Sequence, residues 1–243
     1  MDLVWLDPSD ANAPFPPVHR ALRDPDGLLA VGGDLSVERL MHAYQNGIFP
    51  WYEADQPILW WSPDPRGVLH LDELHVSRSL RKKLRYIERD GIWTITIDQA
   101  FKKTMLACAA PRAYAENTWI TSDMVDAYVN LHKAGHAHSL EVWDENNKLI
   151  GGIYGVASGA IFFGESMFST ETDSSKVAIT YLVEYLKRWD YKMIDCQLPS
   201  EHLCTLGARA IPREAFLLIL EKYLALSPAE QSWKTIPDLR VTN

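Results

Sequence analysis

The sequence predicts an α/β (α+β) protein with a small N-terminal domain and a larger C-terminal domain built on a central mixed sheet. A composition of 47% hydrophobic and 23% charged residues is typical of a globular protein, and 243 residues can bury a substantial core. Apolar or alternating runs that predict strands are interspersed with runs of helical periodicity. In the C-terminal part the order is helix, three strands, helix, strand, helix. We place the domains at residues 1–70 and 71–243.

The N-terminal region begins with a proline-rich and acidic stretch over residues 1–26, which predicts an extended segment. A short strand is expected over 27–31, followed by a turn at Gly32-Gly33-Asp34. Ser36 is a suitable N-cap for a helix over 37–46, and Gly47 is a suitable terminator.

Residues 48–66 contain several prolines and two tryptophan clusters, Trp51 and Trp60-Trp61. This composition favours a rigid loop wall over a regular element. An aromatic cluster with a purely structural role is the simpler explanation of the same residues.

Residues 77–89 predict an amphipathic helix with a strongly basic face. Leu80, Leu84 and Ile87 fall on one side of the helical projection. Five cations fall on the other side, namely Arg78, Arg81, Lys82, Arg85 and Arg89, and Lys83 adds a further cation to the helix. A solvated helix face and a phosphate-binding face explain this pattern equally well, although the chain as a whole carries a net charge of −8.

The rest of the C-terminal domain is expected to alternate between helices and strands. The expected elements are a strand over 93–97, a helix capped by Asp98 and ending at Ala109, a helix over 122–134, strands over 138–143, 149–156 and 160–163, a helix from Ser174 or Ser175 to about Trp189, a strand over 191–196, a short helix over 200–206 and a last helix over 213–226.

Two polar motifs interrupt apolar strands, and they are the candidates for chemistry. Glu165 follows Phe162-Phe163-Gly164, and Asp195 and Gln197 end a second apolar run. Because side chains alternate along a strand, Asp195 and Gln197 should face one way and Cys196 the other, into the core. A structural ion pair for Glu165 and a helix-capping role for Asp195 remain alternatives.

Several other classes of site are disfavoured. Nucleophilic catalysis by Cys196 with His202 or His138 as base is a minor alternative. His136 and His138 lack a third ligand at metal spacing, so no metal is expected. Phosphate-binding glycine loops are absent, so no nucleotide cofactor is expected. With no export signal, no long apolar run and three cysteines, we expect a cytoplasmic protein without a membrane partner.

A set of motifs in order along the chain resembles the leucyl/phenylalanyl-tRNA–protein transferase family. The motifs are Phe49-Pro50-Trp51, Trp60-Trp61-Ser62-Pro63-Asp64-Pro65-Arg66, Thr118-Trp119-Ile120, Gly164-Glu165-Ser166-Met167-Phe168-Ser169, Ser175-Lys176, Ile194-Asp195-Cys196-Gln197 and Thr205-Leu206-Gly207-Ala208. Each motif alone is weak, whereas their combination is specific. The resemblance covers residues 28–216.

The resemblance implies a C-terminal domain similar to the GCN5-related acetyltransferase fold. It also implies transfer of Leu or Phe, and less well Met, from aminoacyl-tRNA to proteins with N-terminal Arg or Lys, which marks them for degradation by an N-degron pathway. We expect a monomer that needs no cofactor. A coenzyme A-dependent acetyltransferase and a non-catalytic tRNA-binding module are the competing hypotheses.

The resemblance also assigns residues. It implies that Asp195 and Gln197 form the relay that accepts the proton of the acceptor amine, and Glu165 is expected to orient that amine or its basic side chain. The aminoacyl pocket is expected to be lined by Tyr44, Trp51, Trp119, Tyr128, Phe162, Ile153 and Ile194, with Ile153 standing where family members carry Met. The basic helix is expected to hold the tRNA.

Overall fold

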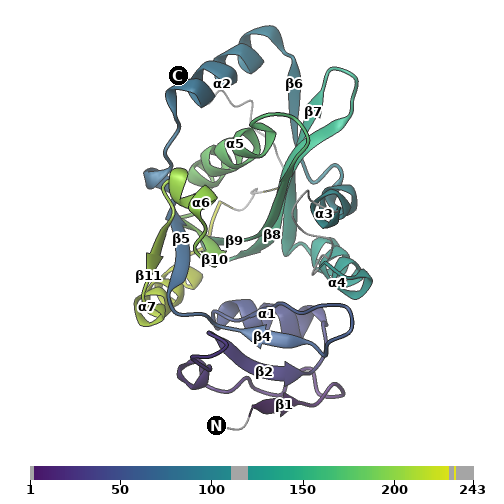
Figure 1. The fold of residues 1–243 in the computed structure, drawn as a ribbon, viewed down its shortest axis with the longest axis vertical. Coiled ribbons are helices and arrows are strands. Elements are labelled where there is room, and N and C mark those ends of the chain that lie inside the picture. Colours follow the sequence, from purple (N-terminus) through teal and green to yellow (C-terminus); the bar gives the residue numbers. More distant parts are fainter. Residues whose placement is uncertain (1–2, 111–119, 230–232, 234–243) are drawn as a thin grey trace.

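The chain forms two sheets, and the mixed α/β architecture expected from the sequence is confirmed. The computed structural model describes residues 3–110, 120–229 and 233. A four-stranded sheet is built from the N-terminal region, and a seven-stranded sheet forms the centre of the larger domain. The small sheet lies at one end of the molecule and the large sheet occupies the middle (Figure 1).

The small sheet has the strand order β1-β2-β4-β3 and carries helix α1 (Val37–Gln45). Its strands are β1 (Val4–Leu6), β2 (Leu28–Gly32), β3 (Phe49–Pro50) and β4 (Leu59–Trp61). The tryptophan-rich stretch expected to be a loop therefore supplies two strands. Trp60 is fully buried and its indole Nε1 donates to the Gly32 carbonyl at 2.8 Å, so β4 is held by its side chain as well as its backbone.

The large sheet has the strand order β11-β5-β10-β9-β8-β7-β6. Its strands are β5 (Arg66–His70), β6 (Trp93–Ile97), β7 (Ala137–Asp144), β8 (Leu149–Ser158), β9 (Ile161–Ser169), β10 (Met193–Gln197) and β11 (Arg209–Ile211). The predicted meander is confirmed as β7, β8 and β9, although β9 continues through Glu165 to Ser169, six residues past its expected end at Phe163. Strand β10 returns parallel to β9, and the other neighbours are antiparallel.

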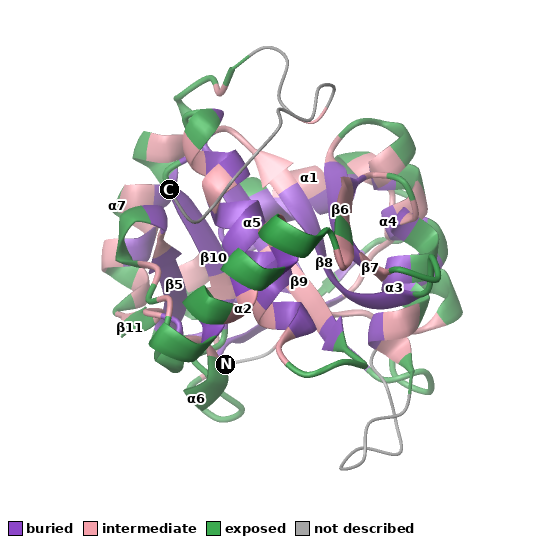
Figure 2. Cartoon of the chain, turned by 90° about the horizontal axis from the view of Figure 1, so that it is seen from above, coloured by how far each residue is buried: buried purple, intermediate pink, exposed green. Residues whose placement is uncertain are grey.

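Helices cover both faces of the large sheet. The further helices are α2 (Arg78–Asp90), α3 (Phe101–Ala109), α4 (Ser122–Lys133), α5 (Ser174–Arg188), α6 (Glu201–Thr205) and α7 (Arg213–Leu224). One apolar core joins the sheet to α2 and α5, and the other joins it to α1, α3, α4 and α7. The buried residues therefore gather along the sheet and α5, whereas the outer side of α2 is exposed (Figure 2).

Local sequence signals explain most helix starts. Ser36, Ser77, Thr121 and Ser200 each accept a hydrogen bond from the helix they precede. The expectation that Asp98 caps α3 is wrong. Its carboxylate instead pairs with the Nδ1 of His138 at 2.7 Å and accepts from the Ser139 amide at 2.8 Å.

The helices of the described residues include none with both the length and the apolar character needed to cross a membrane.

Candidate active site

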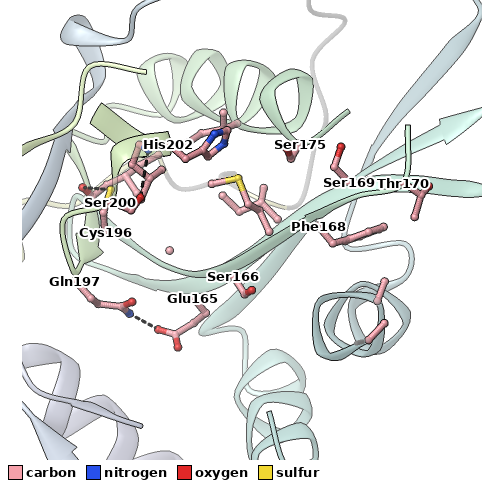
Figure 3. Close-up of a pocket in the computed structure, with 18 residues that line it drawn as sticks. Glu165, Ser166, Phe168, Ser169, Thr170, Ser175, Cys196, Gln197, Ser200 and His202 are labelled. Atoms are coloured by element: carbon pink, nitrogen blue, oxygen red, sulfur yellow. Dashed lines mark hydrogen bonds between the residues drawn. The ribbon is translucent and has the colours of Figure 1, made fainter. Parts of the chain in front are cut away.

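The two polar motifs flank a cavity that opens where strands β9 and β10 separate. The strands pair only over Ile161–Phe163 and Met193–Asp195, after which they diverge. A cavity of about 730 Å³ begins there, with apolar residues along one part of its wall and Glu165 and Gln197 at one end. The carboxylate and the amide meet below the cavity in Figure 3. A splayed pair of parallel strands thus makes a ligand-sized cleft in the middle of the sheet.

Irregular pairing puts the functional side chains into this opening. In β9, Ser166 pairs with Tyr154 and Gly164 with Gly155, so Glu165 is an extra residue in a bulge. In β10 the same irregularity makes Cys196 the extra residue. A bulge re-aims side chains and bends the strand. Gln197 then adopts a left-handed backbone conformation with φ of 58°, which brings its amide to the cavity.

Glu165 is the centre of a hydrogen-bond network contributed by both domains. Its Oε1 accepts from the Tyr44 hydroxyl and from the Gln197 amide, each at 2.7 Å. Its Oε2 lies 3.0 Å from the Tyr128 hydroxyl, and the two tyrosine hydroxyls also contact each other. Because each hydroxyl has one proton, the two protons are shared among these three contacts when Glu165 is ionised. A carboxylate has about four acceptor sites, so three protein partners leave one site on Oε2 unused.

Burial dominates the electrostatics of this network. Burial raises the pKa of Glu165 to about 7, although the hydrogen bonds from Tyr44, Tyr128 and Gln197 act in the opposite direction. Burial, followed by the charge of Glu165, raises the pKa of Tyr44 and of Tyr128 well above the ordinary value. The tyrosines therefore remain protonated donors, and the carboxyl group can exchange a proton near neutral pH.

This raised pKa has a measurable effect on stability. The folded protein binds a proton at Glu165 up to about pH 7, whereas the unfolded chain releases it near 4.5, so stability falls as pH rises between these values. Relative to a Glu165→Gln variant, the wild type should lose about 2–3 kcal/mol of unfolding free energy between pH 5 and pH 8. Urea unfolding of both proteins across this range measures the difference. A difference that is constant with pH would contradict the assignment.

Asp195 does not line the cavity, and the expectation that it shares one hollow with Gln197 is wrong. It is fully buried on the other side of β10, where its carboxylate binds the Arg66 guanidinium through contacts of 2.9 and 2.6 Å. Its Oδ1 also accepts from the Gln197 backbone amide at 2.9 Å. Asp195 therefore neutralises Arg66 and fixes the turn that presents Gln197.

Arg66 is a site residue that sequence reasoning did not single out. Its guanidinium lies between the rings of Phe49 and Phe216, at 4.9 and 4.6 Å from their centroids, and donates to the Gly47 carbonyl at 3.1 Å. It therefore joins the N-terminal domain to the sheet below the cavity. The available signal was a cation in an apolar strand, which requires a buried partner.

Cys196 also departs from expectation, because it lines the cavity with Ile194 and Gln197. Alternation holds for these residues, because Ile194 and Cys196 share the cavity face and Asp195 has the opposite face. The expectation was wrong about which face carries the cavity, and only Gln197, after the bulge, leaves the pattern. Burial raises the pKa of its thiol well above the ordinary range, so the group is held as a poorly nucleophilic thiol. Of the two candidate bases, His202 lines the cavity, whereas His138 pairs with Asp98 and is not a lining residue.

The residues expected to form the aminoacyl pocket divide into several groups. Ile153 and Ile194 line the cavity. Tyr44 and Tyr128 lie behind it as partners of Glu165. Trp119 lies outside the described residues.

Two expected lining residues are elsewhere. Phe162 is buried in the core beside α5 and packs on Trp233, with ring centroids 5.6 Å apart, and it is not among the residues that line this cavity. Trp51 is 42% exposed and packs against Trp61, and it is not among the lining residues either. The residues that sequence reasoning did not assign to the lining include Met167, Phe168, Ile179 and Leu203.

The basic helix α2 has the polarity expected from its sequence. Leu80, Leu84 and Ile87 are buried, whereas Arg78, Arg81, Lys82 and Arg85 are exposed. Lys83 is half-buried and its ammonium lies 4.3 Å from the centre of the Trp93 ring. Within the described part of the chain, none of these cations makes a salt bridge. The helix lies at the end of the molecule remote from the small sheet (Figure 1).

One cluster has the composition of a metal site. Asp98, His132 and His138 offer ligand atoms within 4.8 Å of one another. However, the Nδ1 of His132 pairs with the Ala137 carbonyl at 2.8 Å, and the Nδ1 of His138 pairs with Asp98 at 2.7 Å. The rings also stack on Phe101 and Trp233. Hydrogen bonding and stacking account for this arrangement without an ion.

A carboxyl group whose pKa burial raises to about 7, at the end of a partly apolar cavity, has the chemistry that acyl transfer requires of a general base. The chain belongs to the leucyl/phenylalanyl-tRNA–protein transferase family, which is a family of aminoacyltransferases. The family model "Leucyl/phenylalanyl-tRNA protein transferase" matches residues 68–221, and the model of the family's N-terminal domain matches residues 33–64.

Three relatives carry the name leucyl/phenylalanyl-tRNA–protein transferase. The protein of Stutzerimonas stutzeri is 54% identical over 96% of this chain and 99% of its own length. The protein of Pseudomonas syringae pv. syringae is 53% identical over 95% of this chain and 97% of its own length. The protein of Azotobacter vinelandii is 57% identical over 90% of this chain and 94% of its own length. Among solved structures, that of L-PGS from Bacillus licheniformis is 12% identical, covers 82% of this chain and 62% of its own, and superposes with a TM-score of 0.41.

Proposed function

We propose that this protein transfers Leu or Phe, and less well Met, from aminoacyl-tRNA to the α-amine of proteins that begin with Arg or Lys. The reaction marks the acceptor for an N-degron pathway, and the protein acts as a cytoplasmic monomer. The observation that carries the proposal is the Glu165 carboxyl group, with a pKa of about 7, at the end of the cavity. Family membership supplies the carrier and the class of acyl group.

Glu165 is the proton acceptor in this proposal. An α-amino group titrates near roughly 8, so much of the acceptor is already neutral at cellular pH. The neutral amine attacks the ester carbonyl, a C–N bond forms, and the bond to the ribose oxygen breaks. Glu165 takes the amine proton on the free site of Oε2 and returns it to the departing ribose oxygen. Because the ester is already activated, alignment supplies much of the rate.

The neighbours of Glu165 have supporting roles. Gln197 holds Oε1 through its amide and presents its own carbonyl to the acceptor amine. Asp195 is a positioning residue, because its contacts are with Arg66 and the Gln197 backbone. The Asp195–Arg66 pair is electrically neutral, so Glu165 supplies the negative charge that attracts a cationic N-terminus.

The apolar part of the cavity is proposed to hold the side chain of the transferred amino acid. Ile153, Met167, Ile179 and Ile194 are among its walls. The β-branched side chain of Ile153 has few rotamers, so the wall of the pocket is stiff at this position. The unbranched Met of other family members is more flexible and can adapt to different side chains. Ile153→Met should therefore shift the preference towards larger or unbranched side chains by up to about tenfold. Competition among Leu-, Phe- and Met-tRNA in one reaction measures the shift, and an unchanged ranking would place the side chain elsewhere.

The basic face of α2 is proposed to bind the tRNA. The double variant Arg81→Glu with Lys82→Glu should weaken tRNA binding severalfold and lower the slope of log affinity against log salt. Reversal of two exposed lysines on other elements, Lys133→Glu with Lys148→Glu, is the matched control. Filter binding across a range of salt concentrations measures both. Equal effects of the two double variants would show that only net charge matters.

One assay tests the function itself. Radiolabelled Leu-tRNA is incubated with the protein and a peptide beginning with Arg, Lys or Ala. Transfer to the Arg and Lys peptides, with little to the Ala peptide, supports the proposal. Binding of the tRNA without transfer would indicate a non-catalytic binding module. Saturable use of acetyl-coenzyme A in its place would indicate an acetyltransferase.

A further inference from the structure

The cavity has a second polar end, which the proposed chemistry does not use. Figure 3 shows Ser175 and His202 on the side of α5, away from the Glu165–Gln197 pair. Ser169, Thr170 and Ser200 also line the cavity. A volume of about 730 Å³ is in the range that holds a ligand as large as a drug molecule, so the cavity has room for more than one amino-acid side chain.

The N-terminus of α5 forms part of this end. The first N–H groups of a helix have no carbonyl partner within it and carry the positive end of the helix dipole. The residue before α5, Asp173, makes no side-chain hydrogen bond to these groups, and the first turn contains no acidic residue. The Asp173 carboxylate is instead paired with the Lys176 ammonium at 3.1 Å, which neutralises it. A 15-residue helix therefore begins without a side-chain cap beside the cavity.

Ser175 is the independent observation that points to a ligand. It is 9% exposed and lines the cavity, and its hydroxyl has no hydrogen-bond partner among the described residues. The side chain is mostly buried, but its oxygen is open to the cavity, so a polar group of a ligand in the cavity can reach it. Ser174, its neighbour, is by contrast fully engaged with the Ile150 and Glu171 carbonyls.

The charges around this end do not oppose an anion. The Lys176 ammonium is paired with Asp173, so the two together add no net charge. Burial, and then the charge of Lys176, lowers the pKa of the His202 imidazole. The carboxylate that lines the cavity, Glu165, lies at the opposite end. The Ser174 amide donates to the Glu171 carbonyl at 3.0 Å, so the elements of a phosphate site here are the next amides of the first turn and the Ser175 hydroxyl.

We propose that this end of the cavity, formed by Ser175 and the first turn of α5, binds the 5′-phosphate of the terminal nucleotide that carries the aminoacyl group. The inference rests on the proposed function, because it assumes a nucleotide carrier whose ester lies at Glu165. Phosphate binding at one end and the carboxylate at the other hold the ester between them. The site thus favours donors that end in a nucleotide with a 5′-phosphate, and it helps to align the ester with the acceptor amine.

Two minimal donors test the proposal, namely the 3′-phenylalanyl ester of adenosine and the same ester of adenosine 5′-phosphate. With an Arg-initiated peptide, the wild type should use the phosphorylated donor with a kcat/KM about tenfold higher, as expected for hydrogen bonds to a charged group. Ser175→Asp places a negative charge at the site and should bring this ratio close to one. Ser175→Ala, which keeps the packing, should lower the ratio partially.

Ser79→Asp is the matched control, because Ser79 is also the second residue of a helix and is exposed on α2. It adds the same charge at an equivalent helical position and should leave the ratio unchanged. A wild-type ratio near one, with transfer intact, would overturn the phosphate site and leave the proposed function standing. Absence of transfer even from Phe-tRNA would instead overturn the proposed function.

A second measurement separates the possible sources of the phosphate and does not depend on turnover. Adenosine 5′-phosphate should bind the protein about tenfold more tightly than adenosine, and Ser175→Asp should abolish the difference. If inorganic phosphate alone competes as strongly as the nucleotide, the site binds a free anion, and its assignment to the carrier is wrong.

Discussion

Glu165→Gln is expected to lower the single-turnover rate of aminoacyl transfer by about a hundredfold to ten-thousandfold, the usual contribution of a general base. Gln keeps the size of the side chain and can still interact with Tyr44, Tyr128 and Gln197, but it cannot accept the amine proton. The cavity itself should survive, so binding of aminoacyl-tRNA should change little. Single-turnover transfer to an Arg-initiated peptide measures the rate.

The pH dependence of this variant separates a catalytic role from a structural one. In the wild type the rate should rise as Glu165 ionises near pH 7, and again as the acceptor amine becomes neutral near roughly 8. In the Glu165→Gln variant the rate should keep only the rise that follows from neutralisation of the acceptor amine. Glu145→Gln, which changes an exposed hairpin residue, is the control, and its rate should show both rises with pH. A Glu165→Gln rate within tenfold of wild type would exclude Glu165 as the base.

Asp195→Ala is expected to destabilise the fold by about 3–5 kcal/mol, because it leaves the buried Arg66 guanidinium without a counterion. Arg66→Met should cost a similar amount, since it leaves Asp195 unpaired. The double variant Arg66→Met with Asp195→Leu removes both charges and should recover most of the lost stability. Urea unfolding of the single and double variants measures the coupling between the two residues.

Activity distinguishes the two roles of Asp195. If Asp195 positions Gln197, the double variant should fold but transfer slowly. The reason is that the backbone N–H of Gln197 loses its acceptor, the Asp195 carboxylate. If Asp195 were the proton acceptor that the family resemblance implies, Asp195→Ala would retain wild-type stability and lose only turnover. That result would contradict a structural role for the contacts of Asp195 with Arg66 and with the Gln197 backbone.

Most of the fold could be predicted from sequence patterns, because amphipathic periodicity and capping residues are local signals. The basic helix, β7, β8 and the helix after β9 lie within a few residues of their expected positions, whereas β9 extends six residues past its expected end. The short strands β1, β3, β4, β5 and β11 were not predicted. Each has at most five residues, and their pairing partners are distant in sequence, so no local pattern indicates them.

The polar groups of the site could be found from sequence, but their directions could not. Glu165 and Gln197 stood out because polar residues interrupt apolar strands. Strand alternation correctly put Asp195 and Cys196 on opposite faces, but it does not say which face carries the cavity. It also grouped Gln197 with Asp195, because it assumes a regular pleat and a bulge separates the two residues. The pairing of Arg66 with Asp195 joins residues 129 positions apart, and only the tertiary fold brings them together.

The splayed strands β9 and β10 are expected to hold the Glu165 carboxyl group at the point of ionisation in neutral solution. Carboxyl ¹³C chemical shifts of glutamate-labelled protein, assigned by comparison with Glu165→Gln, report the titration of this group directly. A midpoint near pH 7 is expected for Glu165. A midpoint close to the ordinary glutamate value of about 4.3 would contradict it.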